Sequence, residues 1–238
     1  MNITLWLSNN YIEIFGAVTG IIYVFLEIRQ TIWLWPVGII TSAVYILIFF
    51  ESKFYADMSL QVYYLVISVL GWYWWKRGAG QANEEARGRM GEGENGRSER
   101  SEDSATAEKE DEETEILRDS ETLQVTRIDL KKSVVLAIVF VILYAVMRVV
   151  LKRFTDSPVP EWDSFITSLS IVATWMLARK IYEHWYLWIV VNFVSVALFL
   201  VKGLYPTVIL YAFYGIMSFV GLSSWEKTIR NDLSIIKR

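Results

Sequence analysis

The side chains in this sequence that are best suited to binding a ligand lie inside long apolar stretches. Asn192 sits midway along one of them, and its amide group can both donate and accept hydrogen bonds. Trp185 and Trp188 precede it by seven and four residues, so on a helix the three side chains share a face. Indole rings could stack on a cationic nitrogen heterocycle, with about 0.5–2 kcal/mol gained at each ring, while the amide bound a hydroxyl or a carboxamide.

A structural role is the alternative for each of these residues. Asn192 could join two helices through a hydrogen bond. Trp185 begins its stretch and fits the aromatic belt at a membrane interface, whereas Trp188, one turn deeper, is the stronger ligand candidate. Most other tryptophans near the ends of the stretches are expected in that belt, notably Trp33, Trp35, Trp72, Trp74, Trp75 and Trp225.

Further polar candidates occur in pairs at a constant sequence offset. Gln61 and Tyr64 lie in one apolar stretch, and Tyr211 and Tyr214 occupy the related positions of another. Four polar groups from symmetric positions would suit a binding site on a pseudo-twofold axis; ordinary helix packing with locally bonded hydroxyls is the alternative. Candidates of the same kind are Ser42, Tyr45 and, less strongly, Thr174.

Ionisable groups are rare in the apolar stretches. Glu13, Glu27 and Asp163 all fall near predicted helix ends, so no carboxylate is expected deep in a span. A proton-coupled carrier keeps an ionisable group on its path, so this pattern favours transport without ion coupling. Asp57, before the third stretch, is either an N-cap or a cation-attracting outer mouth.

Catalysis is not expected from this sequence. It has a single histidine, His184, at a predicted helix start, and no cysteine. No serine–histidine pair, paired carboxylates or metal-ligand spacing is evident, so we expect no enzyme activity, cofactor or metal.

Seven apolar stretches must position the candidate residues. The chain has 238 residues, 54% of them hydrophobic, with a mean hydropathy of +0.33. Stretches near 20 residues match a hydrocarbon core of about 30 Å. The fold class expected is therefore all-α and integral to the membrane, with seven transmembrane helices. They run at about 11–28, 33–50, 58–75, 133–151, 163–179, 184–201 and 204–225.

A charged insert at 76–132 separates the third and fourth stretches. It holds 16 of the 26 acidic residues and is rich in Glu, Arg, Gly and Ser, so we expect it to be largely disordered. Its last part regains apolar residues and could form an ordered or interfacial lead-in to the fourth helix. The Lys and Arg bias of the short loops places the N-terminus outside and the insert and C-terminus in the cytoplasm.

An internal repeat organises the helices. Residues 13–75 align without a gap on 163–225, with Arg29/Arg179, Trp35/Trp185, Tyr64/Tyr214 and Gly71/Gly221 among the identities. Each unit has three helices, and a connector helix between them makes the units parallel. We therefore predict a 3+1+3 arrangement, with a substrate site at the interface of the repeats. The segments are 1–75, the insert 76–132, the connector 133–152, the second repeat 163–225 and a cytoplasmic tail 226–238.

Two segments carry a family resemblance. WPVGIITSAVYILIFFESKFYADMSLQVYYLVISVLGWYWW and WYLWIVVNFVSVALFLVKGLYPTVILYAFYG, with the W-x-x-W-x-x-x-N pattern of Trp185, Trp188 and Asn192, resemble the Pnu vitamin transporters. The resemblance covers the chain outside 76–132, an insert that shorter members lack. It implies a seven-helix fold similar to the SWEET sugar transporters, in a bacterial cytoplasmic membrane. It also implies facilitated diffusion, with the substrate trapped by a cytoplasmic kinase.

The resemblance leaves the cargo open. Similar proteins take up nicotinamide riboside, a subgroup takes up thiamine, and others are assigned to riboflavin. Nicotinamide riboside is the leading hypothesis and thiamine the alternative, both being cationic nitrogen heterocycles. The partners expected are this small molecule, membrane lipid and functionally a kinase, with a homo-oligomer possible in principle and no nucleic acid. A membrane sensor or scaffold that uses the insert is a lower alternative.

Overall fold

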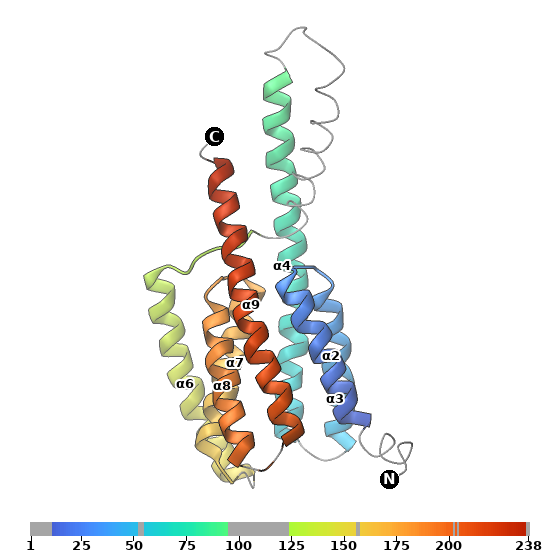
Figure 1. The fold of residues 1–238 in the computed structure, drawn as a ribbon, viewed down its shortest axis with the longest axis vertical. Coiled ribbons are helices and arrows are strands. Elements are labelled where there is room, and N and C mark those ends of the chain that lie inside the picture. The colour runs from blue at the N-terminus through green and yellow to red at the C-terminus, as the bar shows by residue number, and fades with distance from the viewer. Residues whose placement is uncertain are drawn as a thin grey trace.

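The described residues form seven helices and no strand (Figure 1). The computed structural model describes residues 11–51, 55–94, 124–155, 158–201, 203 and 205–236. The helices are α2 (Tyr11–Ile28), α3 (Leu34–Glu51), α4 (Tyr55–Glu94), α6 (Leu130–Phe154), α7 (Pro160–Ala178), α8 (His184–Val201) and α9 (Tyr205–Ile236). Each predicted apolar stretch matches one of these helices to within one residue at the ends that fall outside it, so the all-helical prediction is confirmed. α4 and α9 continue as helices beyond the predicted ends at 75 and 225, and Figure 1 shows both projecting past the bundle.

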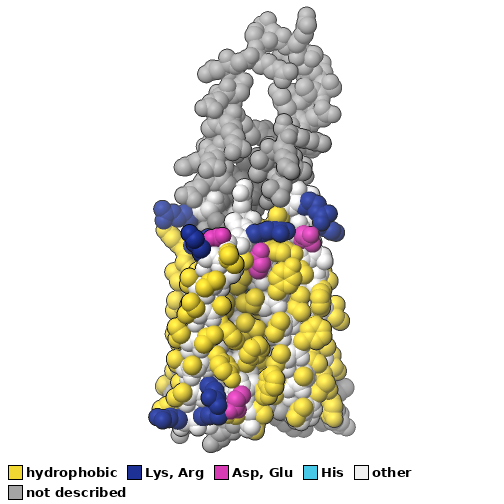
Figure 2. Space-filling model, turned by 90° about the vertical axis from the view of Figure 1, so that its left-hand side faces the viewer, with side chains coloured by type: hydrophobic (Ala, Val, Ile, Leu, Met, Phe, Trp, Pro, Cys, Tyr) yellow, Lys and Arg dark blue, Asp and Glu magenta, His cyan; other side chains and the backbone are white. Residues whose placement is uncertain are grey.

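The surface of the bundle suits a membrane. Three described helices, α6, α8 and Tyr205–Asn231 within α9, are long and apolar enough to cross one. Figure 2 shows a continuous band of apolar side chains, bounded at both ends by charged ones. α6 packs against α7 and has no buried residue, and most of its Val, Ile and Leu side chains are exposed. Such a surface is stable in lipid and not in water. The protein is therefore a membrane protein.

The helices outside α6 pack in equivalent pairs. α3 packs on α4, as α8 packs on α9; α2 packs on α3, as α7 packs on α8. Two further contacts join the halves: α2 packs on α9, and α7 packs on α4. Under the 150-residue offset, α2, α3 and α4 correspond to α7, α8 and α9, so these two contacts are also equivalent.

The turns that follow α2 and α7 have the same backbone structure. Gln30 and Lys180, 150 residues apart, both adopt the left-handed conformation, with φ of 55° and 51°. The N–H groups of Gln30 and Thr31 donate to the carbonyls of Glu27 and Leu26. The N–H groups of Lys180 and Ile181 donate in the same way to Leu177 and Met176. This hydrogen-bond pattern is the Schellman motif, which satisfies the last carbonyls of a helix.

Buried tryptophans form the core next to these turns. Trp35 and Trp75 meet edge to face at 5.4 Å, and Trp185 and Trp225 do so at 5.9 Å. All four are fully buried, so the predicted belt position is wrong for Trp35, Trp75 and Trp225, and the belt alternative for Trp185 is excluded as well. Trp33 and Trp72 are exposed as a belt requires. The cause is a local fit that hydropathy does not show. Gly71 and Gly221 leave the space in which the rings of Trp35 and Trp185 lie, and a Cβ at either glycine would overlap the ring.

The end of the charged insert docks against the second turn. The N–H of Thr126 donates to the carbonyl of Lys180 at 3.0 Å, and the N–H of Tyr182 donates to the carbonyl of Thr126 at 2.9 Å. The Glu183 carboxylate accepts from the N–H of Ile128 at 2.9 Å. Asp129 then caps α6 by accepting from the N–H of Leu130. The lead-in to α6 is thus ordered, and it fixes the turn that precedes His184.

Candidate functional site

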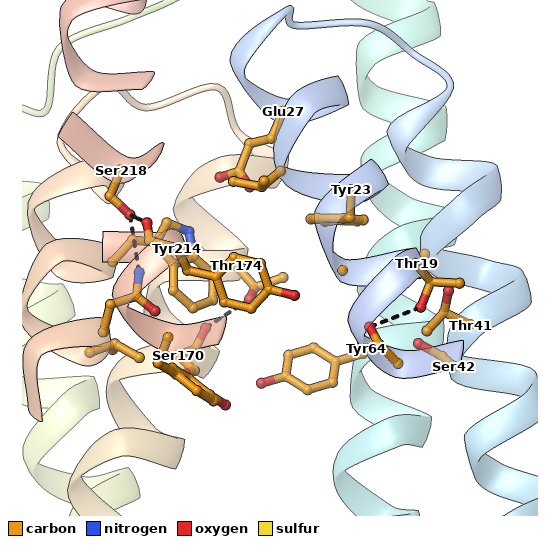
Figure 3. A pocket seen from close by; sticks show the side chains of 18 of the residues that line it. Thr19, Tyr23, Glu27, Thr41, Ser42, Tyr64, Ser170, Thr174, Tyr214 and Ser218 are labelled. Carbon is orange, nitrogen blue, oxygen red and sulfur yellow. Dashed lines mark hydrogen bonds between the residues drawn. The ribbon is translucent and has the colours of Figure 1, made fainter. Parts of the chain in front are cut away.

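A cavity of about 340 Å³ lies at the centre of the bundle and is lined by every described helix except α6. Its volume is in the range of small-molecule sites. The wall is mostly apolar, with hydroxyl, amide and phenol groups distributed around it (Figure 3). Since α2, α3 and α4 face α7, α8 and α9 across it, the cavity lies between the two halves of the molecule.

Most of the predicted site residues lie in the wall of this cavity. They are Ser42, Gln61, Tyr64, Thr174, Trp185, Trp188, Asn192, Tyr211 and Tyr214. Tyr45 does not line the cavity: its ring packs near Phe15 and Phe49, and its hydroxyl lies against the backbone of Gly16. Asp57 falls in the first turn of α4 rather than before it, and its side chain is outside the described part of the chain. For the residues in the wall, contact with a substrate stays a prediction.

Asn192 is held in place by one hydrogen bond. Its Nδ2 donates to Ser218 Oγ at 3.0 Å, and Ser218 Oγ donates to the carbonyl of Tyr214 at 2.8 Å. This is the interhelical bond that the structural alternative foresaw, between α8 and α9. It uses one N–H of the amide, so Oδ1 retains its capacity to accept from a ligand. The bond therefore orients the Asn192 amide and leaves part of its hydrogen-bonding capacity available to a ligand.

Trp185 and Trp188 differ in how they face the cavity. Trp185 is fully buried between Gly221, Trp225 and His184, so it mainly builds the end wall. Trp188 is only partly buried, one turn deeper along α8, and lines the same cavity. Trp188 therefore presents the more accessible aromatic surface to a bound ring.

Sequence reasoning missed a face of α2 that lines the cavity. Gly16, Gly20, Tyr23 and Glu27 lie in its wall at successive spacings of four, three and four residues. That spacing keeps them on one side of a helix, so the periodicity could have revealed the face. The remaining polar residues missed from the wall are Thr19, Thr41, Ser68, Ser170 and Ser218.

Glu27 corrects the expectation that no carboxylate lies on the path. Although it is near the end of α2, it is 4% exposed and lines the cavity. Its Oε1 lies 3.1 Å from Nε2 of His184, which is itself fully buried. Figure 3 places Glu27 above Tyr23, at the end of the cavity nearest the two turns. The end of the helix is buried because α9 covers it, and Trp225 Nε1 donates to the Glu27 carbonyl at 3.1 Å.

The fold and the cavity define an all-helical membrane protein with a central cavity of small-molecule size. The model of the nicotinamide mononucleotide transporter family matches residues 10–227. The chain belongs to this family of transporters, as the resemblance of its two tryptophan-rich segments to the Pnu vitamin transporters predicted.

Individual relatives agree with that assignment. The nicotinamide riboside transporter PnuC of Escherichia coli K12 is 26% identical, over 93% of this chain and 87% of the relative. The riboflavin/roseoflavin transporter RibM of Streptomyces davaonensis is 23% identical, over 92% and 86%. The crystal structure of the vitamin B3 transporter PnuC superposes with a TM-score of 0.64 at 19% identity, covering 96% of this chain and 86% of that one. That superposition shows the shared fold.

Proposed function

We propose that this chain carries nicotinamide riboside across a bacterial cytoplasmic membrane. The observation that carries the proposal is the charge of the cavity wall. Its described residues include one carboxylate, Glu27, and no Lys or Arg. Partly accessible aromatic surface at Trp188 and the amide of Asn192 supply stacking and hydrogen bonding. A cationic pyridinium ring with a carboxamide and ribose hydroxyls matches these groups.

The same wall argues against a phosphorylated substrate. The family description refers to a mononucleotide, whereas the E. coli relative is named for the riboside. A phosphate monoester carries about −1.5 to −2 charges at neutral pH. Moving it into a cavity with a carboxylate and no cation in its described wall would leave buried charge uncompensated, which costs several kcal/mol. The riboside is therefore the better substrate of the two.

We propose a transport mechanism of facilitated diffusion, driven by phosphorylation of the substrate in the cytoplasm. The family membership supports this mechanism. The absence of a carboxylate from the path does not support it, because Glu27 lines the cavity. Phosphorylation would still make uptake one-directional, since the charged product does not suit the cavity. Because catalysis is not required, the chain itself is proposed not to be an enzyme.

The architecture proposed for this mechanism is seven transmembrane helices in a 3+1+3 arrangement, with α6 as the connector. Equivalent turns at Gln30 and Lys180 support two parallel repeats. The N-terminus is proposed to be outside and the C-terminus and charged insert cytoplasmic, on the Lys and Arg bias of the short loops.

Uptake into proteoliposomes tests the function. Labelled nicotinamide riboside should equilibrate across the membrane only when the protein is present, and should accumulate when a riboside kinase and ATP are enclosed. Unlabelled mononucleotide should not compete. If thiamine competes more strongly than unlabelled riboside, thiamine is the substrate. If riboflavin alone competes, the substrate is that for which RibM is named. If the protein neither binds nor transports the riboside, the proposal is wrong.

A further inference from the structure

The buried pair Glu27–His184 holds a defined number of protons. Nδ1 of His184 lies 2.7 Å from the carbonyl oxygen of Ile181, which can only accept, so Nδ1 carries a hydrogen. Nε2 lies 3.1 Å from Oε1 of Glu27, and a hydrogen is needed between them on one side or the other. The pair is therefore neutral overall, either as imidazolium and carboxylate or as imidazole and carboxylic acid.

The surroundings of the pair resist a net charge. His184 is fully buried, Glu27 is 4% exposed, and the rings of Trp185 and Trp225 lie 4.7 Å from the imidazole. An uncompensated charge in such a place costs several kcal/mol. The total charge of this end of the cavity should therefore stay the same when a ligand enters.

No other described group near the pair can readily exchange a proton at neutral pH. The phenols of Tyr23 on α2, Tyr64 on α4 and Tyr214 on α9 are neutral there. Around the turns, Lys180 lies over the ring of Trp75, Arg179 lies over Trp74, and Glu183 accepts from Ile128. Glu226 on α9 pairs with Arg230 at the surface, and Arg29 is exposed. At this end the buried or lining residues of α3 and α7, which include Leu34, Trp35, Thr174 and Leu177, carry no ionisable side chain.

We infer that Glu27 is the residue that selects cationic substrates, and that a bound cation displaces the proton which the empty site shares between Glu27 and His184. On binding, the substrate brings one positive charge and one proton leaves to the solvent. His184 becomes neutral, and the Glu27 carboxylate turns from Nε2 toward the substrate and becomes its counterion. The charge of the site is zero before and after. An uncharged ligand of the same shape leaves the proton where it is. This inference rests on the proposed cationic substrate.

Calorimetry on the purified full chain measures the proton directly. Binding of nicotinamide riboside in buffers of different ionisation enthalpy should show release of about one proton per ligand. Because binding and deprotonation are linked, the affinity should rise with pH wherever that proton is released. The reduced, uncharged dihydropyridine riboside should bind with release of about zero protons and with no such rise.

Glu27→Gln separates charge selection from packing. The variant should bind the cationic riboside at least about 10-fold less tightly relative to the reduced form, and without proton release. Glu183→Gln is the matched control, because that carboxylate is adjacent to His184 in sequence and does not line the cavity. It should behave like the wild type. If Glu27→Gln does not fold, calorimetry on the wild type decides alone.

The outcomes separate this inference from the proposed function. Tight binding of nicotinamide riboside with no net proton release at any pH would overturn the role of the pair and leave the function intact. Proton release that persists in Glu27→Gln would also overturn it. Failure of the wild type to bind or transport the riboside would instead overturn the proposed function.

Discussion

Two equivalent junctions between helix ends, called corners from here on, have the same backbone structure and differ in the chemistry of their side chains. In one, Glu27 at the end of α2 meets His184 at the start of α8. In the other, the equivalent positions are Leu177 at the end of α7 and Leu34 at the start of α3, both fully buried in one apolar cluster. Each corner has the same left-handed turn and an edge-to-face tryptophan pair. The comparison teaches that the repeated features hold the helices in place, whereas the polar pair is a departure from the repeat.

The cavity wall shows the same division of roles. Position 38 is glycine in the first half, and its equivalent is Trp188 in the second. Ser42 corresponds in the same way to Asn192. The first half thus provides space on its side of the cavity, and the second provides the aromatic ring and the amide. A ligand would be recognised mainly by α8 and accommodated mainly by α2 and α3.

The largest effects are expected where the two corners are alike. Gly71→Ala and Gly221→Ala would each force a Cβ into a tryptophan ring, and overpacking of this kind costs about 1–3 kcal/mol. Both should lower the thermal unfolding temperature in detergent to a similar extent. Only Gly221→Ala should also weaken riboside binding, because Trp185 lines the cavity and Trp35 does not. Equal losses of binding would remove the distinction between the halves.

Truncation of the aromatic wall should come next in size. Trp188→Ala removes the accessible ring over the ligand and should weaken riboside binding by roughly 10- to 100-fold, which corresponds to about 1.4–2.8 kcal/mol. Trp188→Phe should recover part of the affinity, since a smaller ring still stacks. Titration of the purified protein with the riboside measures both. Unchanged affinity in Trp188→Ala would mean that the ligand lies elsewhere in the cavity.

Substitutions at Asn192 and at its equivalent position Ser42 should have smaller effects on riboside affinity, and these effects should differ. Asn192→Ala removes a hydrogen-bonding group and leaves Ser218 without its donor, so binding should weaken by about 10-fold. Ser42→Ala, at the equivalent position, should change the affinity by less than about threefold. The ratio of the two dissociation constants is the measurement. A larger loss in Ser42→Ala would reverse the assignment of recognition to α8.

The smallest effect is expected at the docked lead-in, which, among the residues that the structure describes, contacts the turn at Lys180 and has no counterpart at the turn at Gln30. Thr126→Pro removes the N–H that donates to Lys180 and should cost about 1 kcal/mol. Hydrogen exchange should then speed up at the amide of Tyr182, which bonds to Thr126, and stay unchanged at Thr31 in the other turn. Faster exchange at both turns would indicate general unfolding instead of local release.

The parts of this fold that depend on hydropathy and repetition could be predicted from the sequence. The apolar stretches located the helices and the position of Asn192 within one of them, and the offset of 150 led to Tyr64, Tyr214 and Ser42. All four of these residues line the cavity. The predictions that were wrong concern features that depend on contacts between residues far apart in the sequence. Glu27 is near a helix end, where exposure is the usual expectation, and only the packing of α9 over α2 buries it.

The predicted belt position of several tryptophans was wrong for a related reason. A ring at the end of an apolar stretch suits either a membrane interface or a core, and composition does not distinguish them. Trp35 and Trp185 are buried because Gly71 and Gly221, on neighbouring helices, leave room for them. That pairing spans 36 residues in each half and becomes visible only when the helices are placed. Similarly, the sequence does not show that the ring of Tyr45 on α3 packs near Phe15 on α2 and does not line the cavity.

The isolation of α6 has a consequence for how this protein can diverge. Since α6 packs mainly on α7 and has no buried residue, most of its positions are constrained only to remain apolar and helical. Selection should therefore tolerate exchanges among Val, Ile, Leu and Ala there, while it removes equivalent exchanges on α8. A saturation library scored for growth on the vitamin would show α6 as the most permissive of the described helices, and among these helices lineages of this protein should drift fastest along it.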